Sequence, residues 1–201
     1  MSIEFKISTK PVEYTKALRL LENRVNDVLN QKKPELIWIL EHPLIYTSGV
    51  RASKQDILSD KIKIISTNRG GKITLHNKGQ KIIYFVLNLN NRGKNIRTLI
   101  TKVENAIIKF LKLYGVQGKA DRQNIGIWVK GNKISAIGVR VKKWIAYHGC
   151  SINIDNNLDD YKKINPCGLD NDKIISLEKV TTLRIKSINK NLKDCFLKEF
   201  I

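Results

Sequence analysis

The sequence predicts a single domain of the α+β class, covering residues 1–201 and built on a mixed β-sheet. Two long stretches repeat apolar residues at steps of three and four, which is typical of amphipathic helices. Strand-like runs gather in groups instead of alternating strictly with these helices, which favours α+β over a doubly wound sheet. At 201 residues the chain can bury a substantial core, and no repeat or Pro/Gly/Ser-rich linker divides it.

The first half of the chain contains the first of these helices. Residues 4–8 form a short strand-like pattern, and residues 12–31 then present one apolar face, made by Tyr14, Ala17, Leu18, Leu21, Val25, Val28 and Leu29. The nearly continuous apolar run of residues 35–40 predicts a buried strand. Residues 68–80 are rich in Gly, Lys and polar side chains, so we expect a loop that contains one short strand.

The second half predicts a helix followed by an antiparallel meander. After a β-forming run at 81–89, residues 95–114 repeat the helical signature, and Gly115 is suited to end the helix. Two strand-like runs then flank a short turn and a third follows; they comprise residues 125–129, 133–141 and 144–154, with Lys130-Gly131-Asn132 at the turn. An amphipathic segment at 188–200 comes last.

The chain is strongly basic, with 37 Lys and Arg against 18 Asp and Glu and a formal net charge of +19. Such a surface attracts acidic partners, and both nucleic acids and small acidic carrier proteins fit that description. The basic residues are spread along the chain without a dominant block, so a generally Lys-rich composition explains the excess equally well.

Composition also sets expectations for compartment and metal content. No apolar run is long enough to span a bilayer, and the first residues lack the apolar core of a secretory signal, so we expect a cytoplasmic protein without membrane association. Three cysteines, an odd number, do not make a disulfide framework. The sequence has neither a CxxC pair nor an HExxH motif, so we expect no metal site.

Side chains that could take part in catalysis or ligand binding cluster in a few motifs. Each of the three histidines lies in a compact motif: Glu41-His42-Pro43, Thr74-Leu75-His76 and Tyr147-His148-Gly149. A single histidine is more often a hydrogen-bonded structural residue than a catalyst. The pair Gly70-Gly71 lets the backbone approach a ligand closely, although such a pair also occurs in flexible turns.

The sharpest signal is Cys167, in the turn Asn165-Pro166-Cys167-Gly168. It lies outside any core-facing periodic stretch, whereas Cys150 and Cys195 fall in strand and helix patterns, where a buried free thiol is the default. A nucleophilic cysteine needs partial exposure and a cation that stabilises its thiolate. No histidine is near Cys167 in sequence, but Lys133, at the start of a predicted strand, is an available cation.

Taken together, these motifs resemble the lipoyl(octanoyl) transferase family over about residues 14–176. The separation of Lys133 and Cys167 also fits the family. Four segments occur in the family's order: Glu41-His42-Pro43 with Tyr46-Thr47, Arg69-Gly70-Gly71 through Gln80, Lys133 through Val141, and Pro166-Cys167-Gly168-Leu169.

The resemblance implies the fold of the biotin and lipoate protein ligase catalytic core. It implies transfer of an octanoyl group from octanoyl-acyl carrier protein to a lysine of a lipoyl domain, the first step of endogenous lipoate biosynthesis. Cys167 would be the nucleophile that carries the acyl group as a thioester, and Lys133 would lower its pKa and transfer protons. Neither ATP nor a metal would be needed, because a thioester donor is already activated.

The resemblance also implies a substrate pocket and a set of partners. One wall would consist of Arg69, Gly70, Gly71, Lys72, Ile73, Thr74, Leu75 and His76. The facing wall would consist of Ala136, Ile137, Gly138, Gly149, Cys150 and Ser151. The acceptors would be the lipoyl domains of 2-oxoacid dehydrogenase E2 subunits and the glycine cleavage H protein. The enzyme would act as a monomer, without a specific nucleic acid partner.

The sequence departs from the family pattern near the expected pocket. After Thr74 the family usually has Tyr-His-Gly-Pro-Gly-Gln, whereas here Leu75 replaces Tyr and Asn77-Lys78 replaces Gly-Pro. Leu44 also stands where the family has a second proline after His42-Pro43. These changes leave Cys167 and Lys133 in place.

Three alternative functions stay open. An ATP-dependent lipoate or biotin ligase would share the fold, although the GRGRxGR-like loop expected of a biotin ligase is absent from the sequence. A basic nucleic-acid-binding module fits the charge, but no helix pattern shows a dense basic face with interleaved aromatics. A cysteine hydrolase would normally use a histidine base, which cannot be assigned from the sequence.

Overall fold

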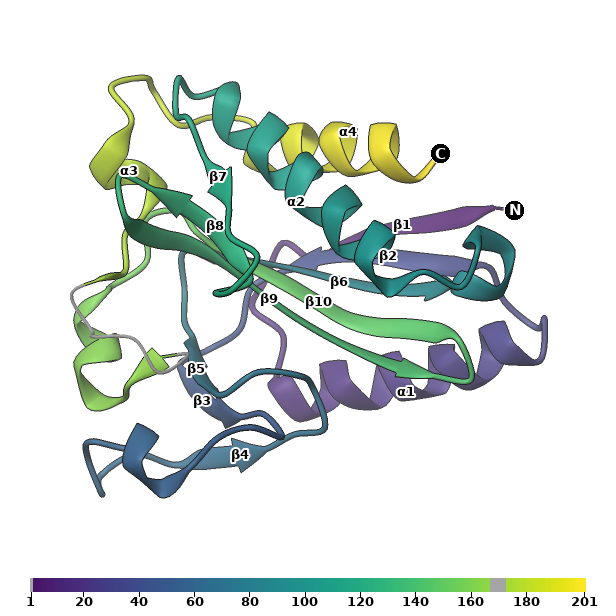
Figure 1. The fold of residues 1–201 in the computed structure, drawn as a ribbon, viewed down its shortest axis with the longest axis horizontal. Helices are drawn as coiled ribbons and strands as arrows, with labels where there is room; N and C mark the ends of the chain where they lie inside the picture. Colours follow the sequence, from purple (N-terminus) through teal and green to yellow (C-terminus); the bar gives the residue numbers. More distant parts are fainter. Residues whose placement is uncertain (1, 167–172) are drawn as a thin grey trace.

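A computed structural model describes residues 2–166 and 173–201, which form three layers with a β-sheet in the middle (Figure 1). The sheet has seven strands in the order β1-β2-β6-β10-β9-β8-β7. Only β1 and β2 pair in parallel, so the mixed sheet predicted from the sequence is confirmed. Its strands are β1 (Ile3–Ile7), β2 (Glu35–Leu40), β6 (Gln80–Asn88), β7 (Lys119–Ala120), β8 (Gly126–Val129), β9 (Asn132–Lys142) and β10 (Ile145–Asn153).

Helices cover both faces of this sheet. In Figure 1, α1 (Tyr14–Leu29) lies on one face, and α2 (Ile96–Lys112) and α4 (Ile188–Phe200) lie on the other. Strand β2 serves both layers because successive side chains point to opposite faces. Its residues Leu36, Trp38 and Leu40 pack with α1, whereas Ile37 and Ile39 join the cluster that includes α2 and α4. In the described residues, no helix combines the length and apolar character needed to cross a membrane.

The predicted antiparallel meander forms β8, β9 and β10, joined by two tight hairpins. The first hairpin turns at Lys130 and Gly131, whose φ angles are 49° and 81°, and the second at Lys143 and Trp144, with 49° and 63°. Positive φ at both central residues defines the turn type whose twist matches paired strands. The register places Gly149 opposite Gly138 and Ser151 opposite Ala136, so the two segments of the predicted facing wall lie side by side.

A second, three-stranded sheet lies beside the large one, in the order β4-β3-β5 (Figure 1). Its strands are β3 (Ile45–Ser48), β4 (Ile64–Ser66) and β5 (Ile73–His76). Strand β5 is the short strand predicted inside residues 68–80, whereas β3, β4 and β7 were not predicted from the sequence. Short single-turn elements complete the described chain: η1 (Lys54–Asp56), η2 (Leu89–Arg92), η3 (Asp159–Lys163) and α3 (Leu177–Val180).

Candidate active site

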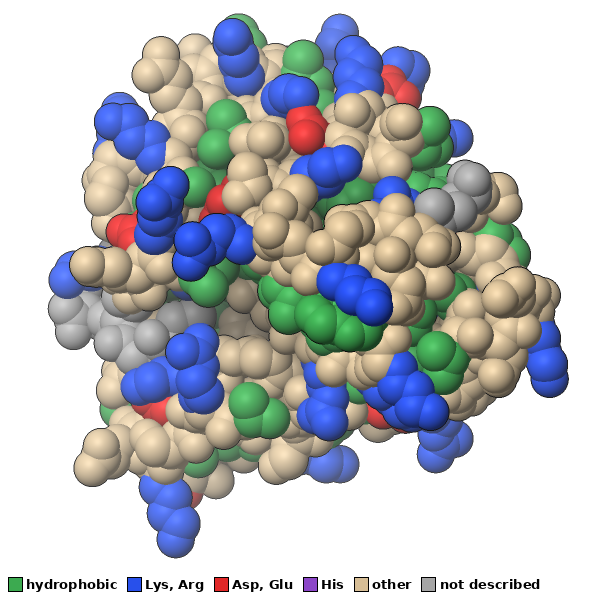
Figure 2. Space-filling view, turned by 45° about the vertical axis from the view of Figure 1, so that its right-hand side comes forward, with side chains coloured by type: hydrophobic (Ala, Val, Ile, Leu, Met, Phe, Trp, Pro, Cys, Tyr) green, Lys and Arg blue, Asp and Glu red, His purple; other side chains and the backbone are tan. Residues whose placement is uncertain are grey.

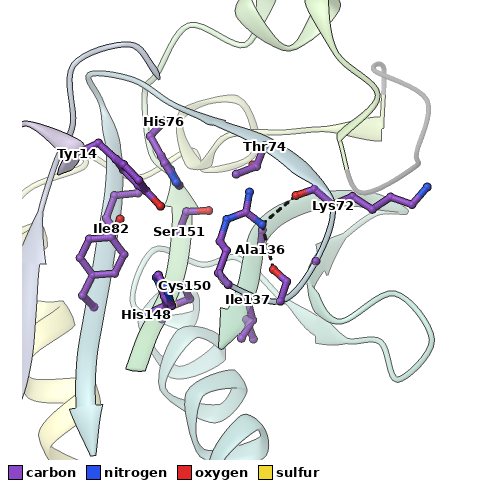
Figure 3. A pocket seen from close by; sticks show the side chains of 16 residues that line it. Tyr14, Lys72, Thr74, His76, Ile82, Ala136, Ile137, His148, Cys150 and Ser151 are labelled. Atoms are coloured by element: carbon purple, nitrogen blue, oxygen red, sulfur yellow. Dashed lines mark hydrogen bonds between the residues drawn. The ribbon is translucent and has the colours of Figure 1, made fainter. Parts of the chain in front are cut away.

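A pocket lies between the two sheets, with β5 and the glycine loop before it on one side and β9 and β10 on the other (Figure 3). Its cavity volume is about 60 Å³. Twelve of the fourteen residues predicted to bind substrate line it: Arg69, Gly70, Gly71, Lys72, Thr74, His76, Ala136, Ile137, Gly138, Gly149, Cys150 and Ser151. Residues from distant parts of the sequence therefore meet in one cavity.

The other two predicted residues, Ile73 and Leu75, do not line this pocket. Both are buried and pack with Tyr46, Tyr161 and Ile164 in a separate apolar cluster. The reason is the two-residue period of a β-strand. Because Thr74 and His76 face the pocket, their neighbours in β5 must face the other way. The prediction that the whole 69–76 segment lines the pocket is therefore corrected for these two positions.

The glycine loop is shaped by Arg69, which is 9% exposed. One terminal nitrogen of its guanidinium donates to the carbonyl oxygens of Gly70 and Lys72, at 3.0 and 2.9 Å. The other donates to the carbonyl and hydroxyl oxygens of Thr47, at 2.8 and 2.9 Å. These bonds hold the loop against β3, so Arg69 organises the pocket rim from within.

Glycines are required where the loop and the strands come close together. A Cβ on Gly149 would lie 1.9 Å from the carbonyl oxygen of Ile83 on the neighbouring strand. A Cβ on Gly138 would lie 3.2 Å from the carbonyl oxygen of Gly70, where the loop meets β9. A larger residue at Gly149 therefore requires a backbone shift, whereas one at Gly138 would only tighten the contact between the loop and β9.

Two of the three histidines, His76 and His148, line this pocket, and all three are neutral at pH 7. Burial lowers the pKa of His42 and His148 to about 4 and that of His76 to about 3, with the charge of Arg69 contributing at His76 and His148. His42 donates from Nδ1 to the carbonyl oxygen of Val12, so its Nε2 accepts from the Tyr84 hydroxyl at 2.9 Å. His148 bonds through Nε2 to Oδ1 of Asn68 at 2.8 Å. Each of the three histidine rings is therefore hydrogen-bonded within the protein, as the sequence led us to expect.

His76 begins a chain of hydrogen bonds that leaves the pocket. Its Nδ1 donates to Oε1 of Gln80 at 2.7 Å, because the amide nitrogen of Gln80 is already used. That nitrogen donates to Oδ1 of Asn153 and to the Tyr161 hydroxyl, both at 2.9 Å. Asn153 in turn donates to the carbonyl oxygen of Ile175 at 3.0 Å. The neutral His76 ring is thereby fixed with Nε2 unprotonated.

Lys133 lies in a second, smaller cavity that adjoins the first. This cavity is lined by Lys133, Ser135, Asn153, Tyr161, Pro166 and Ile174, and shares Thr74, Ala136 and Ser151 with the larger pocket. Lys133 is 5% exposed, and its Nζ lies 5.5 Å from the centre of the Trp128 ring. Its ammonium forms no hydrogen bond or ion pair with any residue that the structure describes.

The chain on either side of residues 167–172 meets Lys133. Pro166, which immediately precedes Cys167 in sequence, lines the same cavity as Lys133. After residue 172, Ile174 forms an isolated parallel β-bridge with Lys133. The backbone amide of Ile175 donates to the Lys133 carbonyl oxygen at 3.0 Å. Cys167, the predicted nucleophile, lies outside the described residues, so its role stays a prediction.

The two described cysteines are poor candidates for a nucleophile. Cys150 and Cys195 are both buried free thiols. Burial raises the pKa of both thiols, and that of Cys150 strongly, so each is a neutral thiol at pH 7. Cys150 lines the larger pocket, but as an apolar wall residue that also packs in the core.

Four pocket residues were missing from the sequence-based set: Tyr14, Ile82, Tyr84 and His148. Tyr14 belongs to the apolar face of α1 and is the first residue of that helix, and its side chain lies at the pocket (Figure 3). Ile82 and Tyr84 are two residues apart in β6 and so lie on the same face of the strand. That spacing does not predict which part of the face borders a pocket. The compact motif around His148 was the one available signal.

The fold and this site define a class of protein. The family profile of the lipoyl protein ligase A/B catalytic domain matches residues 13–200. The chain therefore belongs to the lipoyl protein ligase A/B catalytic-domain family. Among its relatives, the octanoyltransferase of Ehrlichia chaffeensis is 42% identical over 184 residues, which covers 89% of this chain and 86% of the relative.

Solved structures with low sequence identity share the fold. A putative lipoate protein ligase from T. acidophilum with bound lipoic acid has a TM-score of 0.76 at 12% identity, covering 100% of this chain and 86% of that one. A biotin acetyl coenzyme A carboxylase synthetase from Helicobacter pylori has a TM-score of 0.55 at 15% identity, covering 97% and 72%. The predicted likeness to the lipoate and biotin ligase core is confirmed.

Proposed function

We propose that the chain is an octanoyltransferase that moves an octanoyl group from octanoyl-acyl carrier protein to a lysine of a lipoyl domain. The observation that carries the proposal is the adjoining pair of cavities. One is a pocket with mostly apolar or neutral walls, and the other contains a buried lysine and the residue that precedes Cys167. The identity to octanoyltransferases over most of the chain supports the same reaction.

In the proposed mechanism, Cys167 attacks the thioester of the donor. The Lys133 ammonium favours the thiolate of Cys167 and so raises its reactivity at neutral pH. The acyl group moves to the cysteine sulfur, which conserves the thioester, and the donor thiol leaves with a proton. The acceptor lysine amine then attacks the acyl-enzyme, with Lys133 transferring protons as a stable amide forms.

The proposal needs no nucleotide and no metal, because the donor bond is already activated. The walls of the larger pocket would hold the octanoyl chain between the glycine loop and β9. The acceptors would be the lipoyl domains of 2-oxoacid dehydrogenase E2 subunits and of the glycine cleavage H protein, and the enzyme would work as a cytoplasmic monomer.

The surface charge supports protein partners of acidic character. Figure 2 shows Lys and Arg side chains spread over the whole visible face, with only a few acidic ones among them. A net charge of +19 increases the rate at which acidic carrier proteins and acidic domains meet the enzyme.

A direct test combines the purified protein with octanoyl-acyl carrier protein and a lipoyl domain, in chelator and without ATP. The proposal predicts octanoylation of one lysine of the domain, seen by peptide mass spectrometry and lost when that lysine is replaced by arginine. Octanoylation that appears only with ATP, magnesium and free octanoate would instead identify a ligase and overturn the proposal.

A further inference from the structure

The two cavities meet at a wall of three residues: Thr74, Ala136 and Ser151. On the proposed function, the acyl chain occupies the larger pocket and the nucleophile approaches from the side of Lys133 and Pro166. The acyl carbonyl group, where the bonds are made and broken, would then lie at this shared wall. Two of its three side chains, those of Thr74 and Ser151, carry hydroxyl groups.

These two hydroxyls come from opposite walls. Thr74 belongs to β5 in the small sheet, and Ser151 belongs to β10 in the large one. Figure 3 shows both residues at the pocket, with the Ser151 hydroxyl pointing toward its middle. The alternation along β5 that sends Ile73 and Leu75 into the core keeps Thr74 on the pocket side.

Both hydroxyls lack a protein partner. Thr74 and Ser151 are only 8% and 6% exposed, and neither hydroxyl forms a hydrogen bond with any residue in the described part of the chain. Nearby polar groups differ from them: Arg69 bonds to backbone oxygens and His76 to Gln80. Because both residues line the pocket, their hydroxyls are available to bind an atom of a ligand there.

Such a ligand atom would accept hydrogen bonds. A thioester carbonyl oxygen only accepts, and it gains negative charge when a thiolate attacks its carbon, so hydroxyl donors bind the reacting state more strongly. His76 cannot fill this role. Its Nδ1 proton is committed to Gln80, and its low pKa leaves Nε2 an acceptor.

We propose that the Thr74 and Ser151 hydroxyls hold the carbonyl oxygen of the acyl group, a role that rests on the proposed function. When the Cys167 thiolate forms its bond to the carbonyl carbon, the C=O electron pair moves to the oxygen between these two donors. The pair then re-forms C=O, the bond to the donor sulfur breaks, and the departing thiolate takes up a proton from the Lys133 ammonium. The same donors hold the oxygen when the acceptor amine attacks.

The test compares Thr74→Val and Ser151→Ala with the conservative Thr74→Ser. We expect single-turnover acyl-enzyme formation to fall about 10²-fold in the first two variants, the size typical of losing one donor to a tetrahedral intermediate. Thr74→Ser should stay within a few-fold of the wild type, because it keeps the hydroxyl. Ser66→Ala removes an exposed hydroxyl of β4 and serves as the control that should change nothing.

An infrared measurement separates this role from a structural one. With octanoyl-acyl carrier protein labelled with ¹³C at the carbonyl, the acyl-enzyme band should move to higher wavenumber in Thr74→Val and Ser151→Ala, since each loses a hydrogen bond to the oxygen. The melting temperature should not fall in either variant, because no protein partner is lost.

Unchanged rates and unchanged bands in both variants, with a normal acyl-enzyme in the wild type, would overturn this inference alone. A wild-type protein that forms no acyl-enzyme would overturn the proposed function together with it.

Discussion

The two adjoining cavities differ in the charge of the side chains that line them. In the larger pocket, every titratable side chain is neutral or engaged: the histidines lose their charge on burial, and the guanidinium of Arg69 bonds to backbone oxygens. Lys72 forms an ion pair with Asp56 at 3.2 Å. Such a lining suits an apolar acyl chain, because it presents no free charge that binding would strip of water.

The smaller cavity keeps a charge available instead. Lys133 is as buried as the histidines, yet no carboxylate among the described residues pairs with its ammonium. Its stem fits because Gly126 has no side chain: a Cβ there would lie 2.5 Å from Cε of Lys133. Under the proposed function, the fold would hold the substrate in one cavity and activate the nucleophile in the other, with a wall of three residues between them.

The largest expected effect comes from removing the available charge. Lys133→Ala should slow acyl-enzyme formation by about 10²–10⁴-fold and raise the pH at which the acyl-enzyme appears. The variant lacks both the cation that stabilises the thiolate and the group that transfers protons. Lys72→Ala, which removes a lysine already paired with Asp56, should cost at most about tenfold. Single-turnover rates between pH 6 and 9 measure both. Equal losses in the two variants would remove the distinction between the cavities.

The second effect is on stability and concerns the wall of the larger pocket. Gly149→Ala should lower the free energy of unfolding by about 3 kcal/mol or more, because its Cβ would meet the backbone of β6 at 1.9 Å. Gly93→Ala is the control without a clash, since nothing lies within 4 Å of the new Cβ. Its positive φ of 76° leaves only a conformational cost of about 1 kcal/mol. Urea unfolding compares them, and similar losses would mean that β10 can shift to make room.

Sequence patterns predicted the large elements, and the family resemblance indicated most of the residues that line the larger pocket, with identifiable reasons for the misses. The periodicity of α1 and α2 is strong because each buries one apolar face, and strand-like runs around a turn indicated the meander; the structure confirms these elements. Strands β3, β4 and β7 have only two to four residues, too few to show a period. Ile73 and Leu75 were expected in the pocket wall because the family motif covers a continuous segment. In a β-strand, however, successive side chains point to opposite faces, so only every second residue faces the pocket.

The histidines allow a test of the neutral character of the larger pocket. Their pKa values in the folded protein, about 3 to 4, lie below the ordinary value of 6.5. The unfolded chain therefore binds more protons, and stability should be full above pH 6.5 and fall as the pH drops toward 4. Each histidine contributes at most about 1.4 kcal/mol per pH unit.

Urea titrations at pH 7, 6 and 5 measure this slope, and His148→Gln should make it shallower by removing one of the three groups. A wild-type free energy of unfolding that stays constant from pH 7 to 5 would contradict this. It would show that the folded protein takes up protons at the histidines as readily as the unfolded chain does.

The smallest effect should come from the surface, outside both cavities. Transfer from octanoyl-acyl carrier protein should slow by about tenfold or less when salt rises from low to high ionic strength, because screening weakens attraction to a surface of net charge +19. Octanoyl-pantetheine, a small uncharged donor, should show no such dependence. Equal salt effects on both donors would locate the charge effect in the cavities rather than on the surface.

The central claim is that an acyl group passes through Cys167 beside Lys133. The most direct measurement is an intact mass spectrum of the protein after mixing with octanoyl-acyl carrier protein, without ATP, and quenching in acid. The account predicts an increase of one octanoyl group that hydroxylamine removes and that Cys167→Ala lacks. A folded wild-type protein without this adduct, or an adduct that survives in Cys167→Ala, would contradict it.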